Sequence, residues 1–364
     1  MKRRIAALAV AAGCAVAAAG TVGPVMAATA AAAPAAGPRL LPMATSWPTP
    51  QRGIVLGYPS RTAGARPSLL FTANGGRTWR SLPSPPVAYP ADNDQPDAAF
   101  ADGVIVVQDG SRIVITHDQG RRWAAERVAG VSGRRYVSGI AIGRGRVFAL
   151  VTIGTTAALY DGPVAGDVLR AVRGLSITGP HTYGDISAAG GLQVDLGSAG
   201  GRGRYWYSRD GARWAAAPRP CAMAASVLLG AVRAGRVLAL CSGSPSDIGL
   251  GQNDKRVWAA ARLGGVFRPS GPALDSANQQ GFAAASAADL TISTTFALYD
   301  SVNAGRTWRA ELIKPNGASF SDLAFPSAAV GVVVVNSVTD AGREVGAVDR
   351  TTDGGRVWRA LPLP

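Results

Sequence analysis

One short motif returns along most of this chain, and it constrains the fold more than any other feature. A complete copy has the form Ser/Thr-x-Asp/Asn-x-Gly-x-x-Trp, and one copy is a residue shorter. The five recognisable copies contain Thr72, Asn74, Gly76 and Trp79; Thr116, Asp118, Gly120 and Trp123; Ser208, Asp210, Gly211 and Trp214; Ser301, Asn303, Gly305 and Trp308; and Thr351, Asp353, Gly355 and Trp358. Two eroded copies keep a glycine and place Leu169 or Phe267 in the tryptophan position.

The spacing of these copies predicts the architecture. Their last residues are separated by 44, 46, 45, 53, 41 and 50 positions, about 46 on average. Short β-rich runs precede the motifs, as at 104–107 and 113–116, so each unit has room for four strands. Repeats of this length with four strands are typical of β-propeller blades. We therefore predict an all-β, seven-bladed propeller of four-stranded antiparallel blades over residues 43–364.

The two ends of the repeat array support this register. Residues 47–56 match residues 325–334 position for position, from an aromatic followed by proline to an apolar strand. Both terminal blades should therefore be complete, and the ring should close by contact between them. A strand exchanged between the first and last blades remains an alternative.

The motif resembles the Asp box of the BNR repeat family, found in sialidases, sortilin-type receptors and photosystem II stability/assembly factor-like propellers. The resemblance covers residues 42–364 and implies a structural hairpin between the third and fourth strands of each blade. The residues support the same interpretation, because Asn74 and Asn303 replace the aspartate in two intact copies. A turn needs only an acceptor there, whereas metal binding or acid chemistry would need the carboxylate.

An arginine also recurs within five of these hairpins, one or two residues before the tryptophan. We call Arg77, Arg121, Arg213, Arg306 and Arg356 the rim arginines. They are interpreted either as solvated charges or as a basic rim that docks on an anionic polymer.

The BNR resemblance makes a sialidase the obvious enzymatic hypothesis. Such an enzyme would need a tyrosine activated by a glutamate, an aspartate acid/base, three substrate-binding arginines and an early Arg-Ile-Pro motif. That motif is missing, and Glu126, Glu311 and Glu344, the three glutamates of the chain, fall outside the expected inner strands. We therefore expect a non-catalytic binding or scaffold module. The alternative is a carbohydrate-active enzyme, a glycoside hydrolase or lyase, with catalytic candidates Asp92, Asp185 and Asp322.

Metal and ligand candidates are few. Asp92, Asp94 and Asp97 could hold Ca²⁺, but the glycine and closing glutamate of an EF-hand are absent, so a solvated loop is favoured. His117 and His181 form no zinc-binding pattern, and we expect neither a metal nor a cofactor. The run from Tyr205 to Tyr207 could be a carbohydrate platform, although packing between blades explains it equally well.

The N-terminus predicts export. A basic start, an apolar stretch and the small residues before position 28 indicate a signal peptide over 1–27, followed by an Ala/Pro-rich linker over 28–42. Lipidation of Cys14 is the alternative to cleavage. Removal of the signal leaves Cys221 and Cys241, and in an oxidising compartment we expect them to form a disulfide within the fifth blade.

Charge narrows the choice of partners. The formal net charge is +14 at pH 7, and 34 of the 37 basic residues are arginines. No reading helix or interleaved basic and aromatic strand suggests nucleic acid. We expect a secreted monomer without a membrane-spanning segment after cleavage, which binds a protein or an anionic cell-envelope polymer or glycan.

Overall fold

The computed structural model describes residues 40–91, 95–199, 203–221, 226–231, 235–243, 254–313, 319–338 and 344–364. These residues belong to one compact unit, Pro38–Pro364. The expected signal peptide, Cys14 and most of the expected linker lie outside the described residues. Within them no helix could span a membrane.

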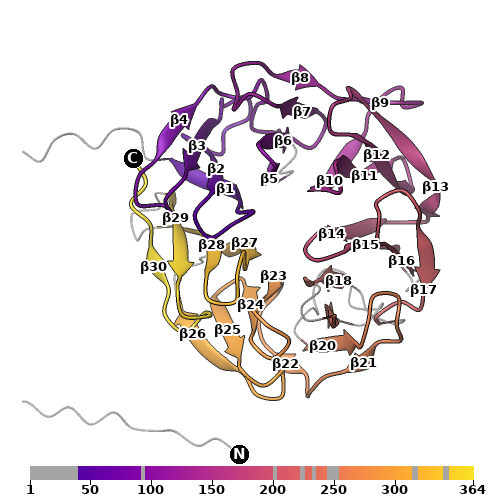
Figure 1. Cartoon of the computed structure of the whole chain (residues 1–364), viewed down its shortest axis with the longest axis vertical. Coiled ribbons are helices and arrows are strands. Elements are labelled where there is room, and N and C mark those ends of the chain that lie inside the picture. The colour runs from indigo at the N-terminus through magenta and orange to yellow at the C-terminus, as the bar shows by residue number, and fades with distance from the viewer. Residues whose placement is uncertain are drawn as a thin grey trace, which may run out of the picture. The chain divides into compact units, whose positions relative to one another are not determined.

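Seven antiparallel sheets form a ring (Figure 1). Blades 1 to 4 comprise β1(Leu41–Ser46), β2(Gly53–Tyr58), β3(Ser68–Thr72) and β4(Arg80–Leu82); β5(Asp97–Ala101), β6(Val104–Gln108), β7(Ile113–Thr116) and β8(Ala124–Ala125); β10(Tyr136–Gly143), β11(Arg146–Ile153), β12(Thr156–Pro163) and β13(Val168–Thr178); and β14(Tyr183–Ser187), β15(Leu192–Gly197), β16(Gly203–Ser208) and β17(Ala215–Ala217). Blades 5 to 7 comprise β18(Ser226–Leu229), β19(Val237–Ser242), β20(Asp254–Ala260) and β21(Arg268–Pro269); β23(Gln279–Ala284), β24(Leu290–Thr294), β25(Ala297–Ser301) and β26(Arg309–Ile313); and β27(Ser319–Ala324), β28(Gly331–Val338), β29(Glu344–Thr351) and β30(Arg359–Ala360).

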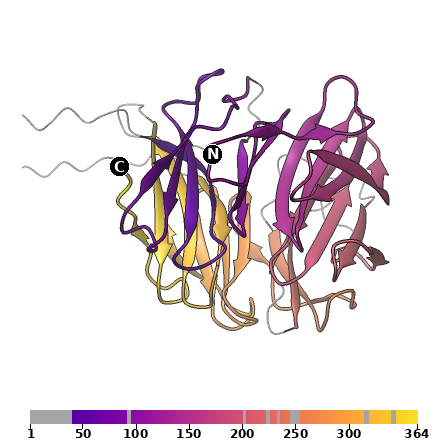
Figure 2. The same ribbon diagram turned by 45° about the horizontal axis from the view of Figure 1, so that its top comes forward.

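The predicted seven-bladed propeller is therefore confirmed. Each blade is a meander in chain order, with its first strand innermost around the ring axis and its last strand on the outside (Figures 1 and 2). Two short strands extend the meanders. β9(Arg127–Val128) pairs in parallel with β13, and β22(Leu274–Asp275) pairs with β20.

The core lies between the blades rather than within one central cluster. The second strand of a blade has neighbouring blades against both of its faces, so β2, β6, β15 and β19 are buried at every position. This explains why these strands read as continuous apolar runs instead of alternating ones. Leu69 of blade 1 and Ile105 of blade 2, for example, share one buried cluster.

The matching sequences of the first and last blades make equivalent aromatic contacts in the structure. Trp47 contacts Trp79 edge-on with ring centroids 6.1 Å apart, and Phe325 contacts Trp358 in the same way at 6.0 Å. Gly53 and Gly331 lie beneath the Trp47 and Phe325 rings, where an added Cβ would come within 2.7 Å of ring atoms or closer. Both ends of the array are complete blades.

The folded body begins earlier than residue 43. Leu41 and Pro42 belong to β1 and pair with Tyr58 and Gly57, so these two residues are not linker. The composition of 28–42 hides this start, because Leu41 contributes a buried side chain to a segment otherwise rich in alanine and proline.

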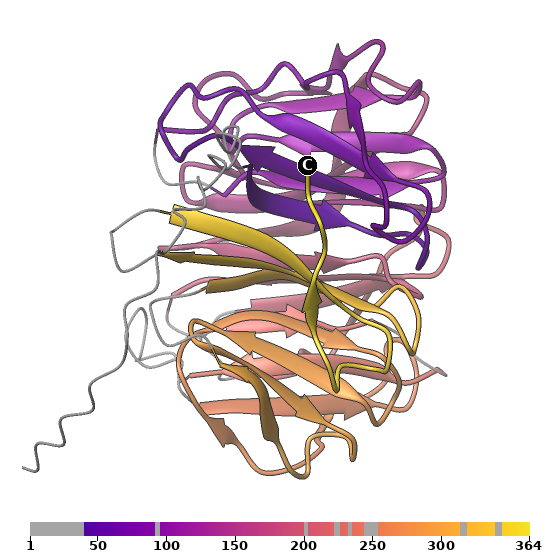
Figure 3. The same cartoon turned by 90° about the vertical axis from the view of Figure 1, so that its left-hand side faces the viewer.

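The ring closes without an exchanged strand. Blade 1 contains only N-terminal strands and blade 7 only C-terminal ones (Figure 3). We call the contact between these two blades the seam. The Thr45 N–H donates to Asp322 Oδ2 across it at 2.7 Å, and Val55 and Val334 share a buried cluster.

A disulfide joins Cys221 and Cys241 in blade 5, as expected. Their Cα atoms are 6.2 Å apart, and Cys241 pairs with Val227 of the neighbouring strand β18. The bridge therefore ties the connection that enters blade 5 to its second strand.

Candidate functional site

The repeated motif forms the hairpin between the third and fourth strands of its blade. In the first copy Asn74 Oδ1 accepts the Thr72 hydroxyl and the Thr78 N–H, both at 3.0 Å. The Gly76 N–H donates to the Thr72 hydroxyl at 2.9 Å, and this glycine has φ +84°. The other four copies repeat the pattern, including the shorter one at Ser208.

Aspartate and asparagine act alike in these hairpins. Asp118 Oδ1 accepts the Thr116 hydroxyl at 2.9 Å and the Arg122 N–H at 2.9 Å, the contacts that Asn74 makes. The Arg122 N–H is also the main reason that the pKa of Asp118 lies below its usual value. The turn therefore already uses one carboxylate oxygen of Asp118 for two hydrogen bonds.

The rim arginines are all exposed. Because the blades share one strand order, their third-to-fourth-strand hairpins lie at the same end of the ring. Arg122 and Arg209 are further exposed arginines in the same hairpins. This end therefore carries positive charge in five of the seven blades.

Two of the three catalytic candidates from the sequence lie on inner strands. Asp185 belongs to β14 and Asp322 to β27, whereas Asp92 lies outside the described residues. A third inner-strand carboxylate is Asp97, the first residue of β5. We call Asp97, Asp185 and Asp322 the axial carboxylates; they come from blades 2, 4 and 7.

Each axial carboxylate accepts a backbone N–H from the inner strand of the next blade. Asp185 Oδ2 accepts the Leu229 N–H at 2.6 Å, and Asp322 Oδ2 accepts the Thr45 N–H. Asp97 Oδ2 accepts the Ile140 N–H at 3.4 Å. Inner strands have no sheet partner on the axial side, so these bonds satisfy donors that would otherwise lack a partner.

The surroundings of the axial carboxylates favour their neutral forms. Burial raises the pKa of Asp185 to about 7, and repulsion from Asp195 and Asp97 adds to the effect. Burial likewise raises the pKa of Asp322, with further repulsion from Asp97. All three residues are half-buried.

Sequence reasoning missed a buried ion pair next to Asp185. Arg219 Nε and Nη2 donate to the two carboxylate oxygens of Asp195, both at 2.8 Å, and Nη2 also donates to the Tyr183 hydroxyl at 3.3 Å. Asp195 pairs with Asp185 across β14 and β15. The alternation of β15 places Gln193 and Asp195 on one face, which was the only signal available from sequence.

The remaining candidates from the sequence are dispersed. Tyr205 packs edge-on against Phe267, and Trp206 is buried on the opposite face of β16, so packing between blades accounts for this run. His117 and His181 are exposed. Asp94, like Asp92, lies outside the described residues. Within the residues that are described, no three His, Cys, Asp or Glu side chains come together as metal ligands.

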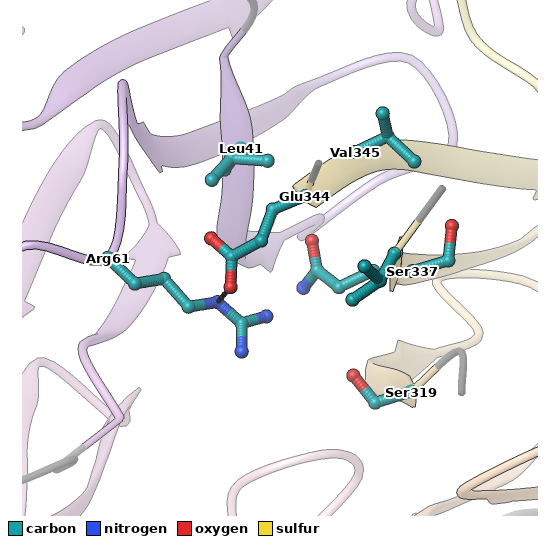
Figure 4. Close-up of a pocket in the computed structure, with 8 residues that line it drawn as sticks. Leu41, Arg61, Ser319, Ser337, Glu344 and Val345 are labelled. Atoms are coloured by element: carbon teal, nitrogen blue, oxygen red, sulfur yellow. Dashed lines mark ion pairs between the residues drawn. The ribbon is translucent and has the colours of Figure 1, made fainter. Parts of the chain in front are cut away.

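The three glutamates do not lie on inner strands. Glu126 lies between β8 and β9, and Glu311 belongs to the outer strand β26. Glu344 begins β29 and forms an ion pair with Arg61 across the seam at 3.5 Å. Figure 4 shows this pair beside Leu41, Ser319, Ser337 and Val345, around a hollow of about 50 Å³ that is large enough for water only.

Comparison with known proteins supports the fold. No model of a known protein family matches the sequence, and no curated protein sequence does. Among solved structures, the chain is similar to YCF48 bound to a D1 peptide (17% identity, 85% of this chain and 98% of that one, TM-score 0.53) and to a PL25 ulvan lyase (10%, 85% and 92%, 0.54). It is also similar to the β-propeller domain of the trilobed protease from Pyrococcus furiosus, described as having an open velcro topology (6%, 89% and 98%, 0.53).

These likenesses and the geometry define the class of protein. The chain is a seven-bladed β-propeller, and its neighbours in structure include both a peptide-binding protein and an enzyme.

Proposed function

We propose that this protein is a secreted, non-catalytic binding propeller of the BNR/Asp-box type, which attaches to an anionic cell-surface polymer through the rim arginines. This proposal depends mainly on one observation: an exposed arginine recurs at one end of the ring in five of the seven blades. The hydrogen bonds of the five hairpins support membership in the Asp-box family. The basic and apolar N-terminus supports export.

The bonding of the axial carboxylates supports a non-catalytic role. A glycosidase needs one carboxylic acid and one carboxylate facing a substrate. Here one oxygen of each axial carboxylate already accepts a backbone N–H that links two blades. Linking two blades is a structural role, and it accounts for an acidic side chain at each of these positions without assigning it a catalytic function.

A ring of arginines suits a polymer better than a small anion. An ion pair with a single exposed arginine contributes little binding free energy, but a flexible polyanion can contact arginines on several blades at once. Attraction of this kind is long-ranged and weakens as salt increases.

Binding of the purified mature protein to lipoteichoic acid, heparin and polygalacturonate at 50 and 300 mM salt tests the proposal. We expect salt-sensitive binding to at least one polymer. Replacement of all five rim arginines by glutamine should weaken it by about tenfold or more.

The matched control replaces five exposed arginines at the opposite end of the ring, and it gives the same net charge. These are Arg66, Arg112, Arg134, Arg204 and Arg256. If both variants lost binding equally, binding would depend on net charge and not on the position of the rim arginines, and the proposal would be wrong. An absence of polymer binding would point instead to a protein partner.

A carbohydrate-active enzyme is the second candidate, and one observation favours it. A carboxyl with a pKa of about 7, as at Asp185, has the property that a general acid requires. Release of reducing ends or of unsaturated products from the same polymers, lost in Asp185→Asn, would replace the binding proposal with this one.

A further inference from the structure

The seven inner strands end around a cavity of about 460 Å³ on the ring axis. Six blades contribute their apolar side chains to its wall, and blade 4 contributes the turn that follows β14. The bulky side chains in this wall include Trp47, Phe100, Ile142, Leu229, Phe282 and Phe325. None of the described residues that line this cavity is ionisable.

Its size and lining suit a small organic molecule. Ligand cavities in proteins measure roughly 300 to 1,000 Å³ and are mostly apolar, with a few polar groups that orient the ligand. A hydrated inorganic ion would lose its water against these walls without gaining ligands. The body of a ligand held here must therefore be apolar.

The axial carboxylates lie just beyond the cavity on three of the same strands. Asp322 directly precedes the lining residue Leu323, Asp185 is two residues before Ser187, and Asp97 is three before Phe100. A strand rises by about 3.3 Å per residue, so the three carboxylates lie about 3 to 10 Å further along the axis.

These carboxylates lie close enough to influence one another electrostatically. Their blades, the second, fourth and seventh, distribute them around the ring, and Asp97 repels both Asp185 and Asp322. Each uses one oxygen for an N–H of the next inner strand, and within the described residues Asp322 Oδ1 has no hydrogen-bond donor. Once they are ionised, these carboxylates therefore attract a positive group with N–H donors.

We propose that the axial cavity binds a small organic amine, with its apolar body between the ends of the inner strands and its ammonium group among the axial carboxylates. This site is separate from the rim arginines and does not depend on polymer binding. Since the ammonium group stabilises ionised carboxylates, affinity rises with pH through the titration of Asp185 near pH 7.

Three probes of one shape test this proposal by calorimetry on the mature chain at pH 8. They are 4-phenylbutylamine, 4-phenylbutanol and 4-phenylbutyrate. The amine should bind about tenfold more tightly than the alcohol, and the carboxylate should bind most weakly. Asp322→Asn and Asp185→Asn should each reduce the affinity for the amine towards that of the alcohol, whereas the exposed Asp275→Asn should not.

A second variant tests the cavity itself. Ala189 is exposed at its edge, so Ala189→Trp should fill the entrance without disturbing the core and remove binding of both amine and alcohol. Ala63→Trp, on an exposed connection of blade 1 outside the lining, is the matched control.

Three results would overturn the proposal. If none of the probes binds, or if Ala189→Trp leaves binding unchanged, the cavity is not the site. If the alcohol binds as tightly as the amine at pH 8, the axial carboxylates do not select an ammonium group. Should Asp185→Asn fail to fold, Asp322→Asn and the pH dependence of wild-type affinity give the same decision. Polymer binding by the rim can succeed or fail independently of each outcome.

Discussion

At the scale of single residues, the hairpin motif requires an oxygen acceptor and not a charge. Asn74 and Asp118 accept equivalent hydroxyl and N–H donors in their two blades. We therefore expect Asp118→Asn to leave the free energy of unfolding nearly unchanged. Asp118→Ala removes both acceptor contacts and should lower the free energy of unfolding clearly. Urea denaturation checks this, and an equal loss in both variants would show that the charge itself is needed.

The axial carboxylates make a prediction about pH. Burial raises the pKa of Asp185 from 3.8 to about 7, so the folded state binds more protons than the unfolded state between these values. The contribution of Asp185 to stability is therefore present below about pH 4 and is lost as pH rises towards 7. Asp97, Asp322, Asp300 and Glu126 are shifted in the same direction.

Comparison of Asp185→Asn with the wild type isolates one of these groups. The variant should lose stability less steeply between pH 4 and 7, and the two curves should become parallel above pH 8. Thermal unfolding across this range provides the measurement. Parallel curves over the whole range would mean that Asp185 keeps an ordinary pKa.

These residues also show how far sequence could specify the site. Asp185 and Asp322 could be placed on inner strands from their position in the repeat. Asp97 was grouped with Asp92 and Asp94, because nothing local shows that β5 begins at this residue. The partners of Asp185 and Asp322 are 44 and 277 residues away, so only the closed ring reveals those bonds.

At the scale of strands and blades, sequence was a good guide because each blade repeats the same physical solution. Even the eroded copies form blades, since Leu169 and Phe267 are buried where other blades have tryptophan. The short strands β9 and β22 could not be predicted. Each pairs over only two residues and depends on where the neighbouring strand already lies.

Blade 5 contains the disulfide, and removal of this bond should destabilise mainly this blade. The two cysteines are 20 residues apart, so the bridge restricts a loop of moderate length in the unfolded chain. Replacing both by alanine should lower the free energy of unfolding by about 3 kcal/mol. Urea denaturation of this variant, and of the wild type with and without dithiothreitol, tests the value. If reduction destabilised the alanine variant as much as the wild type, the effect would not come from this bridge.

At the scale of the whole ring, closure was the feature that sequence left open. Complete first and last blades are compatible with either simple contact or an exchanged strand, because the choice depends on pairing between distant termini. The structure uses contact alone: the Thr45–Asp322 bond, the Arg61–Glu344 pair and a shared apolar cluster. Stability of the ring therefore depends on side-chain packing at the seam.

The C-terminal segment makes this dependence testable. Leu361 packs into the apolar cluster of the seam and lies against Gly76, where an added Cβ would be 2.7 Å from its side chain. Leu361→Ala should lower the free energy of unfolding by about 1 to 2 kcal/mol, less than for a fully buried leucine. Because no strand crosses the seam, amide hydrogen exchange should accelerate first in β1 and β27, on its two sides.

Ile313→Ala is the matched control, since Ile313 is 62% exposed at the end of β26 and should change neither the free energy of unfolding nor the exchange rates. Faster exchange spread evenly over all seven blades would instead mean that the ring unfolds as one unit and that the seam is no weaker than any other contact between blades.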